Sequence, residues 1–127
     1  MSKRGGFDRN QLLVPMSLED YIDKDNPVRQ IDRAVNALDL VALGFAEPKA
    51  AGRPPYAACD LLKLYVYGQL NGIASSRKLE AETRRNLEVM WLLRGLRPDH
   101  KTIAEFRRKY PKALPTAMKS AISLMGH

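Results

Sequence analysis

The sequence contains one cysteine, Cys59, and two histidines, His100 and His127, and each scarcity excludes a class of protein. A single thiol cannot form an internal disulfide framework, so the chain fits a reducing compartment. One cysteine and two distant histidines cannot supply a Cys/His zinc site. We therefore expect no metal and no cofactor, and we expect Cys59 to be a small core residue rather than a reactive thiol.

Long apolar runs are also missing. No stretch approaches the roughly 20 apolar residues that cross a bilayer. The basic start, Met1–Gly6, is not followed by the apolar segment of a secretory signal. We expect a cytoplasmic protein with no membrane partner, and a length of 127 residues with 45% hydrophobic residues is typical of one globular domain.

Catalytic signatures are absent too. We find no Cys/His arrangement with a third partner, no glycine-rich loop after a strand, and no paired carboxylates in an apolar setting. The acidic clusters Glu19-Asp20 and Asp23-x-Asp25 lie on a polar segment, where helix capping and solubility explain them. We predict no catalytic residue and no metal ligand.

Positive charge is present, and it is confined to one part of the chain. The segment Met1–Gly72 has nine Lys/Arg against nine Asp/Glu, whereas Ile73–His127 has twelve against five, which accounts for the whole formal net charge of +7. A basic part joined to a neutral part indicates a polyanion-facing surface on a packing scaffold, with nucleic acid as the commonest partner. A surface that only keeps the protein soluble is the alternative.

Apolar residues recur at helical spacing, and no segment alternates apolar and polar residues long enough to form a strand. We predict an all-α fold: a compact bundle of about five to six helices over residues 17–127, after an extended arm at residues 1–16. Asn26-Pro27 is expected to start a helix. The helix over 57–70 is apolar nearly all round and should be central, and Gly72 is placed to end it in a left-handed cap.

The other predicted elements follow from capping and breaking residues. A capping box at Ser17 predicts one turn of helix, and Thr102 is expected to cap a helix that Pro111 closes. Elsewhere we expect a helical turn over 39–44, a loop over 47–55, a helix over 75–93 with a kink near Asn86, and a last helix over 116–125.

The segment from Asp60 to Asn86 has the layout of a helix-turn-helix unit, with a short glycine-containing turn between two helices. On the second helix four cations lie on one side and apolar residues on the other, so the cations could contact phosphates. These cations are Arg77, Lys78, Arg84 and Arg85. A solvated helix whose arginines pair with Glu80, Glu82 and Glu88 fits equally well.

A second basic segment follows. Ile103, Phe106 and Tyr110 form an apolar stripe, and the helix N-terminus beside Arg97 and Lys101 is favourable for a phosphate. We expect Asp99 to be a cap or turn residue and His100 an exposed loop residue. The predicted DNA-binding residues of both segments are Arg77, Lys78, Arg84, Arg85, Arg97, Lys101, Arg107 and Arg108.

Several ordered motifs resemble those of insertion-sequence transposases of the InsH type. They are Phe7-Asp8-x-x-Gln11-x-x-x-x-Pro15, Asn26-Pro27-Val28-Arg29, Gly52-Arg53-Pro54-x-Tyr56, Leu61-Leu62-Lys63, Tyr67-Gly68-x-x-x-Gly72-Ile73-x-Ser75-Ser76-Arg77-Lys78-Leu79-Glu80, Trp91-Leu92 and Arg97-Pro98-Asp99-His100-x-Thr102-Ile103-x-x-Phe106-Arg107. The resemblance covers roughly residues 7 to 110.

The resemblance implies the helical N-terminal domain of a cut-and-paste DDE transposase, which serves recognition of terminal inverted repeats and assembly. In that family three carboxylates on a ribonuclease-H-like fold hold two divalent metals and carry out strand transfer. The chain stops at His127, and none of its acidic residues can be carried over to that triad. We therefore expect a truncated or fragmentary transposase that binds double-stranded DNA and does not cut or join it.

A protein-interaction or dimerisation module is the alternative function. The basic helices would then contact a second copy or a full-length transposase, and Tyr65 and Tyr67 would form a dimer face. Such a module would modulate the full-length enzyme rather than bind DNA.

Overall fold

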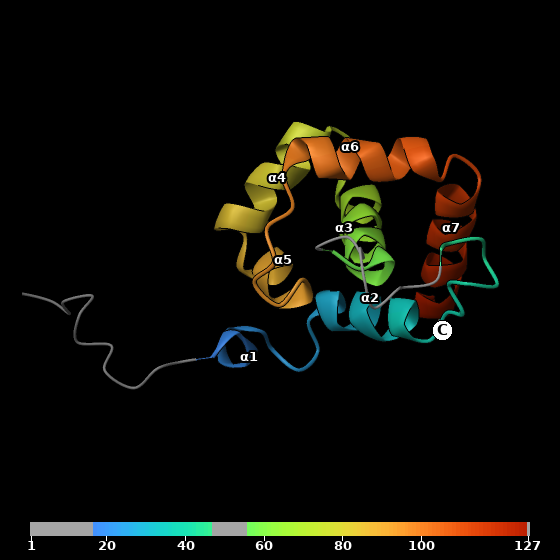
Figure 1. The fold of residues 1–127 in the computed structure, drawn as a ribbon. Helices are drawn as coiled ribbons and strands as arrows, with labels where there is room; N and C mark the ends of the chain where they lie inside the picture. Colours follow the sequence, from blue (N-terminus) through green and yellow to red (C-terminus); the bar gives the residue numbers. More distant parts are fainter. Residues whose placement is uncertain (1–16, 47–55, 127) are drawn as a thin grey trace, which may run out of the picture.

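Every regular element in the described residues, 17–46 and 56–126 of the computed structural model, is an α-helix (Figure 1). The seven helices of this part are α1 (Leu18–Tyr21), α2 (Pro27–Asn36), α3 (Ala58–Asn71), α4 (Ser76–Arg85), α5 (Leu87–Leu92), α6 (His100–Lys109) and α7 (Ala113–Met125). The predicted all-α fold is confirmed. The predicted arm at 1–16 and loop at 47–55 lie outside the described residues.

Two helix boundaries predicted from local signals are confirmed. The Asn26 side chain caps α2 by accepting a hydrogen bond from the backbone N–H of Val28 at 2.8 Å, ahead of the proline at the first helical position. Gly72 follows α3 with φ of 73°, the left-handed conformation that glycine adopts without a steric penalty. Both signals act within a few residues of the chain, which is why sequence alone reveals them.

Other predicted boundaries are wrong. The single helix predicted over 75–93 is two helices, because Asn86 both ends α4 and caps α5 by accepting a hydrogen bond from the N–H of Glu88 at 2.9 Å. Helix α7 begins at Ala113 rather than at residue 116. The helical turn predicted over 39–44 is present as hydrogen-bonded turns, with the N–H of Leu43 donating to the Asp39 carbonyl at 3.1 Å. The described residues form seven helices rather than the predicted five to six, and the split at Asn86 accounts for part of this difference.

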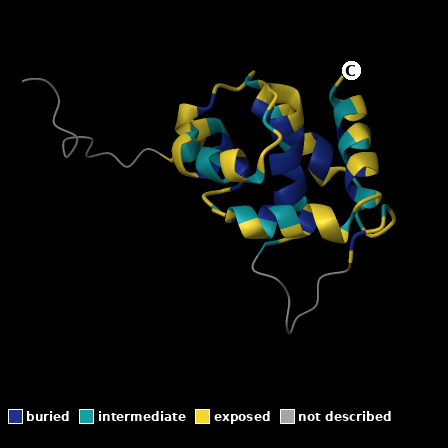
Figure 2. Ribbon diagram, turned by 90° about the horizontal axis from the view of Figure 1, so that it is seen from above, coloured by how far each residue is buried: buried dark blue, intermediate teal, exposed yellow. Residues whose placement is uncertain are grey.

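Helix α3 lies in the middle of the fold, enclosed by α2, α5, α6 and α7 (Figure 1). The residues coloured as buried are concentrated along it in Figure 2. Leu62, Leu64 and Val66 have no exposed surface, so nearly their full transfer free energy from water stabilises the fold. The predicted central position of this helix is therefore confirmed.

Two charged residues are buried on α3, and each has an oppositely charged partner. The Lys63 amine lies 2.7 Å from a carboxylate oxygen of Asp32 on α2, and Asp60 accepts a hydrogen bond from Arg94 at 2.8 Å. Both α3 side chains are 2% exposed. Because a buried charge without a partner is costly, these pairs constrain how α2 and the segment after α5 pack on α3.

A partly buried polar network joins the start of α2 to α3, α4 and α5. The Tyr67 hydroxyl donates to Glu88 at 2.6 Å, and the Asn26 side chain donates to the other oxygen of that carboxylate at 2.9 Å. The Asn86 side chain donates to the Tyr67 hydroxyl oxygen at 3.0 Å. Burial and the neighbouring Glu88 raise the pKa of Tyr67 to about 12, so the hydroxyl stays protonated and keeps donating.

Gly68 allows the chain to turn closely from α3 into α4. Its carbonyl accepts a hydrogen bond from the N–H of Ile73 at 2.8 Å. A Cβ atom at position 68 would overlap the Ile73 carbonyl oxygen and come within 3.0 Å of Leu79 on α4. The glycine therefore sets how close α4 and the preceding turn can approach α3.

We predict that Gly68→Ala lowers the free energy of unfolding by about 1–2 kcal/mol, because the cost of overpacking exceeds the helix-propensity gain of alanine. Urea denaturation followed by circular dichroism measures this. Gly126→Ala is the matched control, since a Cβ there meets only ordinary contacts. Equal stability of the two variants would contradict the close approach at Gly68.

Candidate nucleic-acid interface

The two basic segments predicted from the sequence lie on helices that pack against each other, α4 and α6. Near the middle of α4, Glu80 accepts hydrogen bonds from the backbone N–H of His100 at 2.8 Å and from its Nδ1 atom at 2.7 Å. Just before α4, the Ala74 carbonyl accepts from the Arg107 guanidinium at 3.0 Å. The start of α6 thus lies beside mid-α4 and its end beside the start of α4, an antiparallel arrangement.

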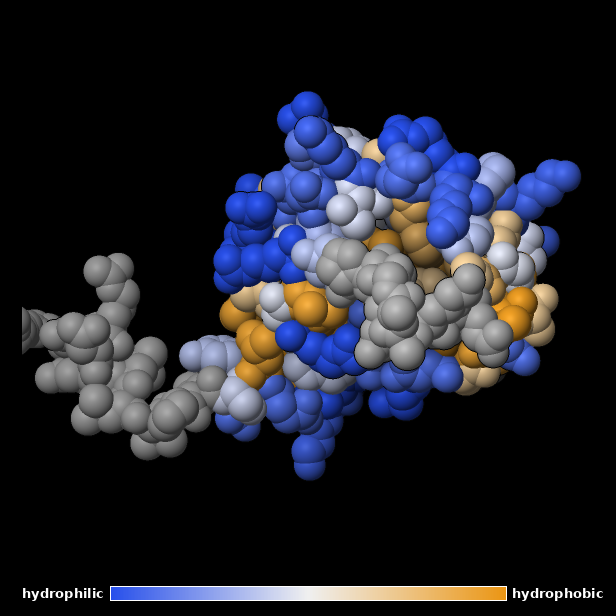
Figure 3. All heavy atoms as spheres, viewed as in Figure 1, coloured by the Kyte–Doolittle hydropathy of each residue, from blue (hydrophilic) through white to orange (hydrophobic). Residues whose placement is uncertain are grey.

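All eight predicted DNA-binding side chains are exposed on or beside these helices. Arg77, Lys78, Arg84 and Arg85 lie on α4, Arg97 lies between α5 and α6, and Lys101, Arg107 and Arg108 lie on α6. We call these eight side chains the α4–α6 cations. Figure 3 shows hydrophilic residues over the end of the molecule that Figure 1 assigns to α4 and α6.

The arrangement on α6 follows from its helical periodicity. Ile103 and Phe106 are buried, and they fix the side of the helix that faces the core. Lys101 and Arg108 are seven positions apart, two turns of helix, so they lie on one side, roughly opposite the buried pair. The core contacts of α6 therefore direct these two cations to solvent.

Three of the α4–α6 cations pair with glutamates on their own helix. Arg84 lies 3.1 Å from Glu80 and Arg85 lies 2.9 Å from Glu82, while Arg108 pairs with Glu105. The predicted pairing with Glu88 is wrong, since Glu88 binds Tyr67 and Asn26 instead. Ion pairs at this spacing on a helix surface are weak, so a phosphate can replace the carboxylates as the partner of these exposed arginines.

The other cations are in different environments. Arg77, Lys78, Arg97 and Lys101 form no ion pair with any described residue. Arg107 has a structural role, because its guanidinium also lies 5.2 Å from the centre of the Tyr65 ring, a cation–π distance. The side chains that an anion can reach without displacing a partner are thus at the start of α4 and just before and within the first turn of α6.

Helix dipoles give some of these positions a structural explanation. Arg84 and Arg85 lie in the last turn of α4, and Arg107 and Arg108 in the last turn of α6. Cations are stabilising there because the helix C-terminus carries partial negative charge. The four cations without partners do not have this explanation.

The N-terminus of α6 differs from the prediction. The prediction that Thr102 caps the helix is wrong, whereas the prediction that Asp99 is a cap or turn residue is confirmed. The Asp99 side chain caps α6 by accepting from the Thr102 N–H at 2.9 Å, and this hydrogen bond lowers the pKa of Asp99. His100 begins the helix and is half-buried rather than an exposed loop residue. Because Glu80 and Asp99 accept from two of the N–H groups at this helix end, carboxylates already bind most of the donors that were predicted to hold a phosphate.

Sequence reasoning missed the positioning role of Glu80. The sequence suggests this residue only as a partner for arginines on its own helix. Its hydrogen bonds to His100 cross twenty positions of sequence, and no spacing rule relates a helix-surface glutamate to such a distant N–H. These hydrogen bonds lower the pKa of Glu80, so the carboxylate is ionised at neutral pH.

The proposed dimer face is wrong, because Tyr65 and Tyr67 are buried at 4% and 6% exposure. Their hydroxyls donate to the Ile103 carbonyl and to Glu88. Within 17–46 and 56–126, no helix is long and apolar enough to cross a membrane. The same residues contain no group of three or more His, Cys, Asp or Glu side chains arranged to hold a metal ion.

The fold and the α4–α6 cations together define a small basic α-helical domain. Residues 16–109 match the family described as Transposase domain (DUF772). Since the match covers most of the chain, this protein belongs to that family of transposase domains, and the predicted transposase relationship is confirmed at this level. No curated relative and no solved structure matches the chain.

We predict that Glu80→Ala lowers the melting temperature at pH 7 because the first N–H of α6 loses its acceptor. The pKa of Glu80 is lowered in the folded state, so its contribution is present above the ordinary carboxyl pKa and is lost as pH falls through the folded value. Calorimetry at pH 7 and pH 3 measures both effects.

The wild-type and Glu80→Ala melting temperatures should therefore converge at acid pH. Glu105→Ala is the control, because it removes an exposed carboxylate whose salt bridge lies within α6. A difference between wild type and Glu80→Ala that is unchanged from pH 7 to pH 3 would show that the ionised carboxylate does not join α4 to α6.

Proposed function

We propose that this chain is the DNA-binding and assembly module of an insertion-sequence transposase of the InsH type, and that the α4–α6 cations contact double-stranded DNA. The observation that carries the proposal is the packing of α4 against α6, which brings two basic segments of the sequence together. Family membership supports a role in transposition. The DNA that we propose this domain recognises is the terminal inverted repeat of the element.

The helix–turn–helix order of α3 and α4 suggests how the domain meets a duplex. In proteins of that type the N-terminal residues of the second helix reach base edges in the major groove, while other cations hold phosphates. Arg77 and Lys78 occupy the first turn of α4 and have no carboxylate partner among the described residues. We propose that they contact base edges, with Arg97 and Lys101 on the phosphate backbone.

The same proposal assigns DNA binding without cleavage to this domain. A DDE reaction requires carboxylates free to hold two divalent metals. The buried or partly buried acidic residues named above have structural partners instead: Asp32 pairs with Lys63, Asp60 with Arg94, and Glu88 with Tyr67 and Asn26. Catalysis would have to come from carboxylates outside this domain.

Salt dependence tests the proposal directly. If about six phosphates are neutralised, the affinity for duplex DNA should fall on the order of 10³-fold between 50 and 200 mM salt, because bound counterions are released. Fluorescence anisotropy with a labelled terminal-repeat duplex measures it, and an unrelated duplex of equal length separates specific from general binding. An affinity that does not change with salt would overturn the proposal.

Neutralising the unpaired cations of α4 tests where on the domain the duplex binds. We predict that Arg77→Gln/Lys78→Gln weakens binding of the terminal repeat on the order of tenfold at 100 mM salt and reduces its preference over the unrelated duplex, because the variant no longer contacts base edges. If the two side chains held phosphates instead, binding of both duplexes would weaken alike and the salt slope would fall by about 2, one for each phosphate.

The control is Lys24→Gln/Arg33→Gln, which removes the same charge on or beside α2, at the opposite edge of the molecule from α6 (Figure 1). Both control side chains are exposed and form no ion pair with other described residues. Equal weakening by the two double variants would mean that net charge, rather than the α4–α6 cations, determines binding.

A further inference from the structure

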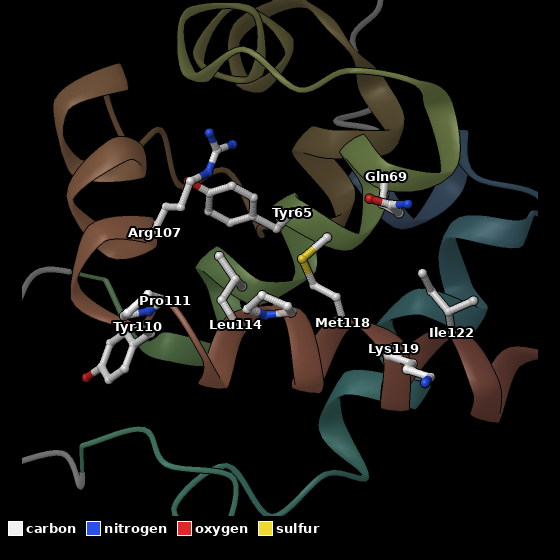
Figure 4. A pocket seen from close by; sticks show the side chains of 10 residues that line it. Tyr65, Gln69, Arg107, Tyr110, Pro111, Leu114, Met118, Lys119 and Ile122 are labelled. Carbon is white, nitrogen blue, oxygen red and sulfur yellow. The ribbon is translucent and has the colours of Figure 1, made fainter.

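An open groove lies on the surface between α3, α6 and α7, separate from the exposed sides of α4 (Figure 4). It has a volume of about 560 Å³. Its apolar lining includes Tyr65 from α3 and Leu114, Met118 and Ile122 from α7. A groove of this size and composition accommodates a few apolar side chains of a ligand.

The charged lining of this groove is entirely positive. Arg107 and Lys119 line it and lie toward opposite ends of the row of apolar side chains in Figure 4. The remaining lining residues are uncharged. A low-dielectric groove with cations at both ends attracts a ligand that combines apolar groups with negative charge.

Helix α7 has two half-buried apolar residues at the edge of the side that packs against the core. Leu114, Ala117 and Ala121 are buried on one side, while Met118 and Ile122 are only half-buried, and Lys119 is the single charged residue among the thirteen of the helix. The exposed outer side of α7 includes the polar residues Thr116, Lys119 and Ser123. The apolar surface that this helix offers to a ligand of the groove therefore lies at the edge of the groove, at Met118 and Ile122.

We propose that this groove binds an amphipathic helix of a partner protein, with apolar residues at i, i+4 and i+7 against Met118 and Ile122 and acidic residues beside Arg107 and Lys119. This is the helix-in-groove mode of recognition. Helix α7, which forms one wall of the groove, lies beyond residue 109, the last residue of the family match. The inference does not rest on the DNA-binding proposal, although Arg107 belongs both to the α4–α6 cations and to the groove lining.

The positive charge of the lining favours an acidic amphipathic helix over a second copy of the chain or duplex DNA as the ligand of this groove. A second copy docked through the same groove would bring like cations together, because the lining contains no carboxylate, and like charges that face each other are unfavourable. Duplex DNA would satisfy the cations and leave the apolar side chains against a charged backbone. An acidic amphipathic helix can pair its carboxylates with the cations and pack its apolar residues against the apolar side chains of the groove.

The probe is a labelled synthetic peptide with leucines at i, i+4 and i+7 and glutamates on both flanks, compared with the same peptide carrying lysines in place of glutamates. We expect the glutamate peptide to bind the whole chain at least about tenfold more tightly, since each charge pair is worth several-fold. Fluorescence anisotropy gives the affinities, and amide shifts in NMR spectra locate the peptide on α3, α6 and α7.

Two lysine substitutions form the matched test. Lys119→Glu, in the groove lining, should weaken binding of the glutamate peptide by at least about fivefold and improve binding of the lysine peptide. Lys112→Glu makes the same charge change at an exposed position outside the lining and should have a smaller effect on both. Circular dichroism checks that both variants fold.

Three results would overturn the inference: no binding of the glutamate peptide, equal binding of both peptides, or equal effects of the two lysine variants. Met118→Asp provides a further test, because a charge in the apolar lining should abolish peptide binding. A concentration-dependent dimer of the wild type that this variant cannot form, measured by sedimentation, would instead assign the groove to a second copy.

Discussion

The hydrogen bonds of one carboxylate, Glu80, determine how the basic parts of this domain are arranged. By accepting from the backbone and ring of His100, Glu80 fixes the start of α6 against the middle of α4. The arginine at the far end of α6, Arg107, completes the joint by donating to the turn before α4. The excess of positive charge in the last 55 residues is thereby gathered on the surface of two packed helices. The contact that holds these two helices together includes a negatively charged group, the Glu80 carboxylate.

The neutral part of the chain supplies the scaffold for that surface. Helix α3 is buried along most of its length, and its two charged residues in the core, Asp60 and Lys63, are matched by partners from outside the helix. Because a buried charge tolerates few alternative positions, these pairs favour one packing of the neighbouring elements. Gly68 then permits the close turn that places α4. Apart from Arg107, the α4–α6 cations can remain exposed because core packing does not depend on them.

Sequence reasoning succeeds where the signal is local. The cap at Asn26, the left-handed glycine at Gly72 and the apolar character of α3 each follow from a few neighbouring residues, and all are found in the structure. It fails where the partner is distant: Glu80 accepts from His100, twenty residues away, and the buried Lys63 pairs with Asp32 on another helix. Pairing between distant side chains depends on the tertiary fold, which helical periodicity does not encode. The candidate cations can be predicted because the net positive charge is confined to one part of the sequence. Only the structure shows which of these cations have carboxylate partners.

In the proposed function, α4 and α6 together form the surface that contacts DNA. Mapping amide chemical-shift changes in a ¹⁵N-labelled sample, as duplex DNA is added, tests it most directly. If α4 and α6 bind the duplex, the largest changes should fall in the first turn of α4 and around Arg97 and Lys101, with little change in α2. Changes concentrated on α2 or scattered evenly over the domain would contradict it.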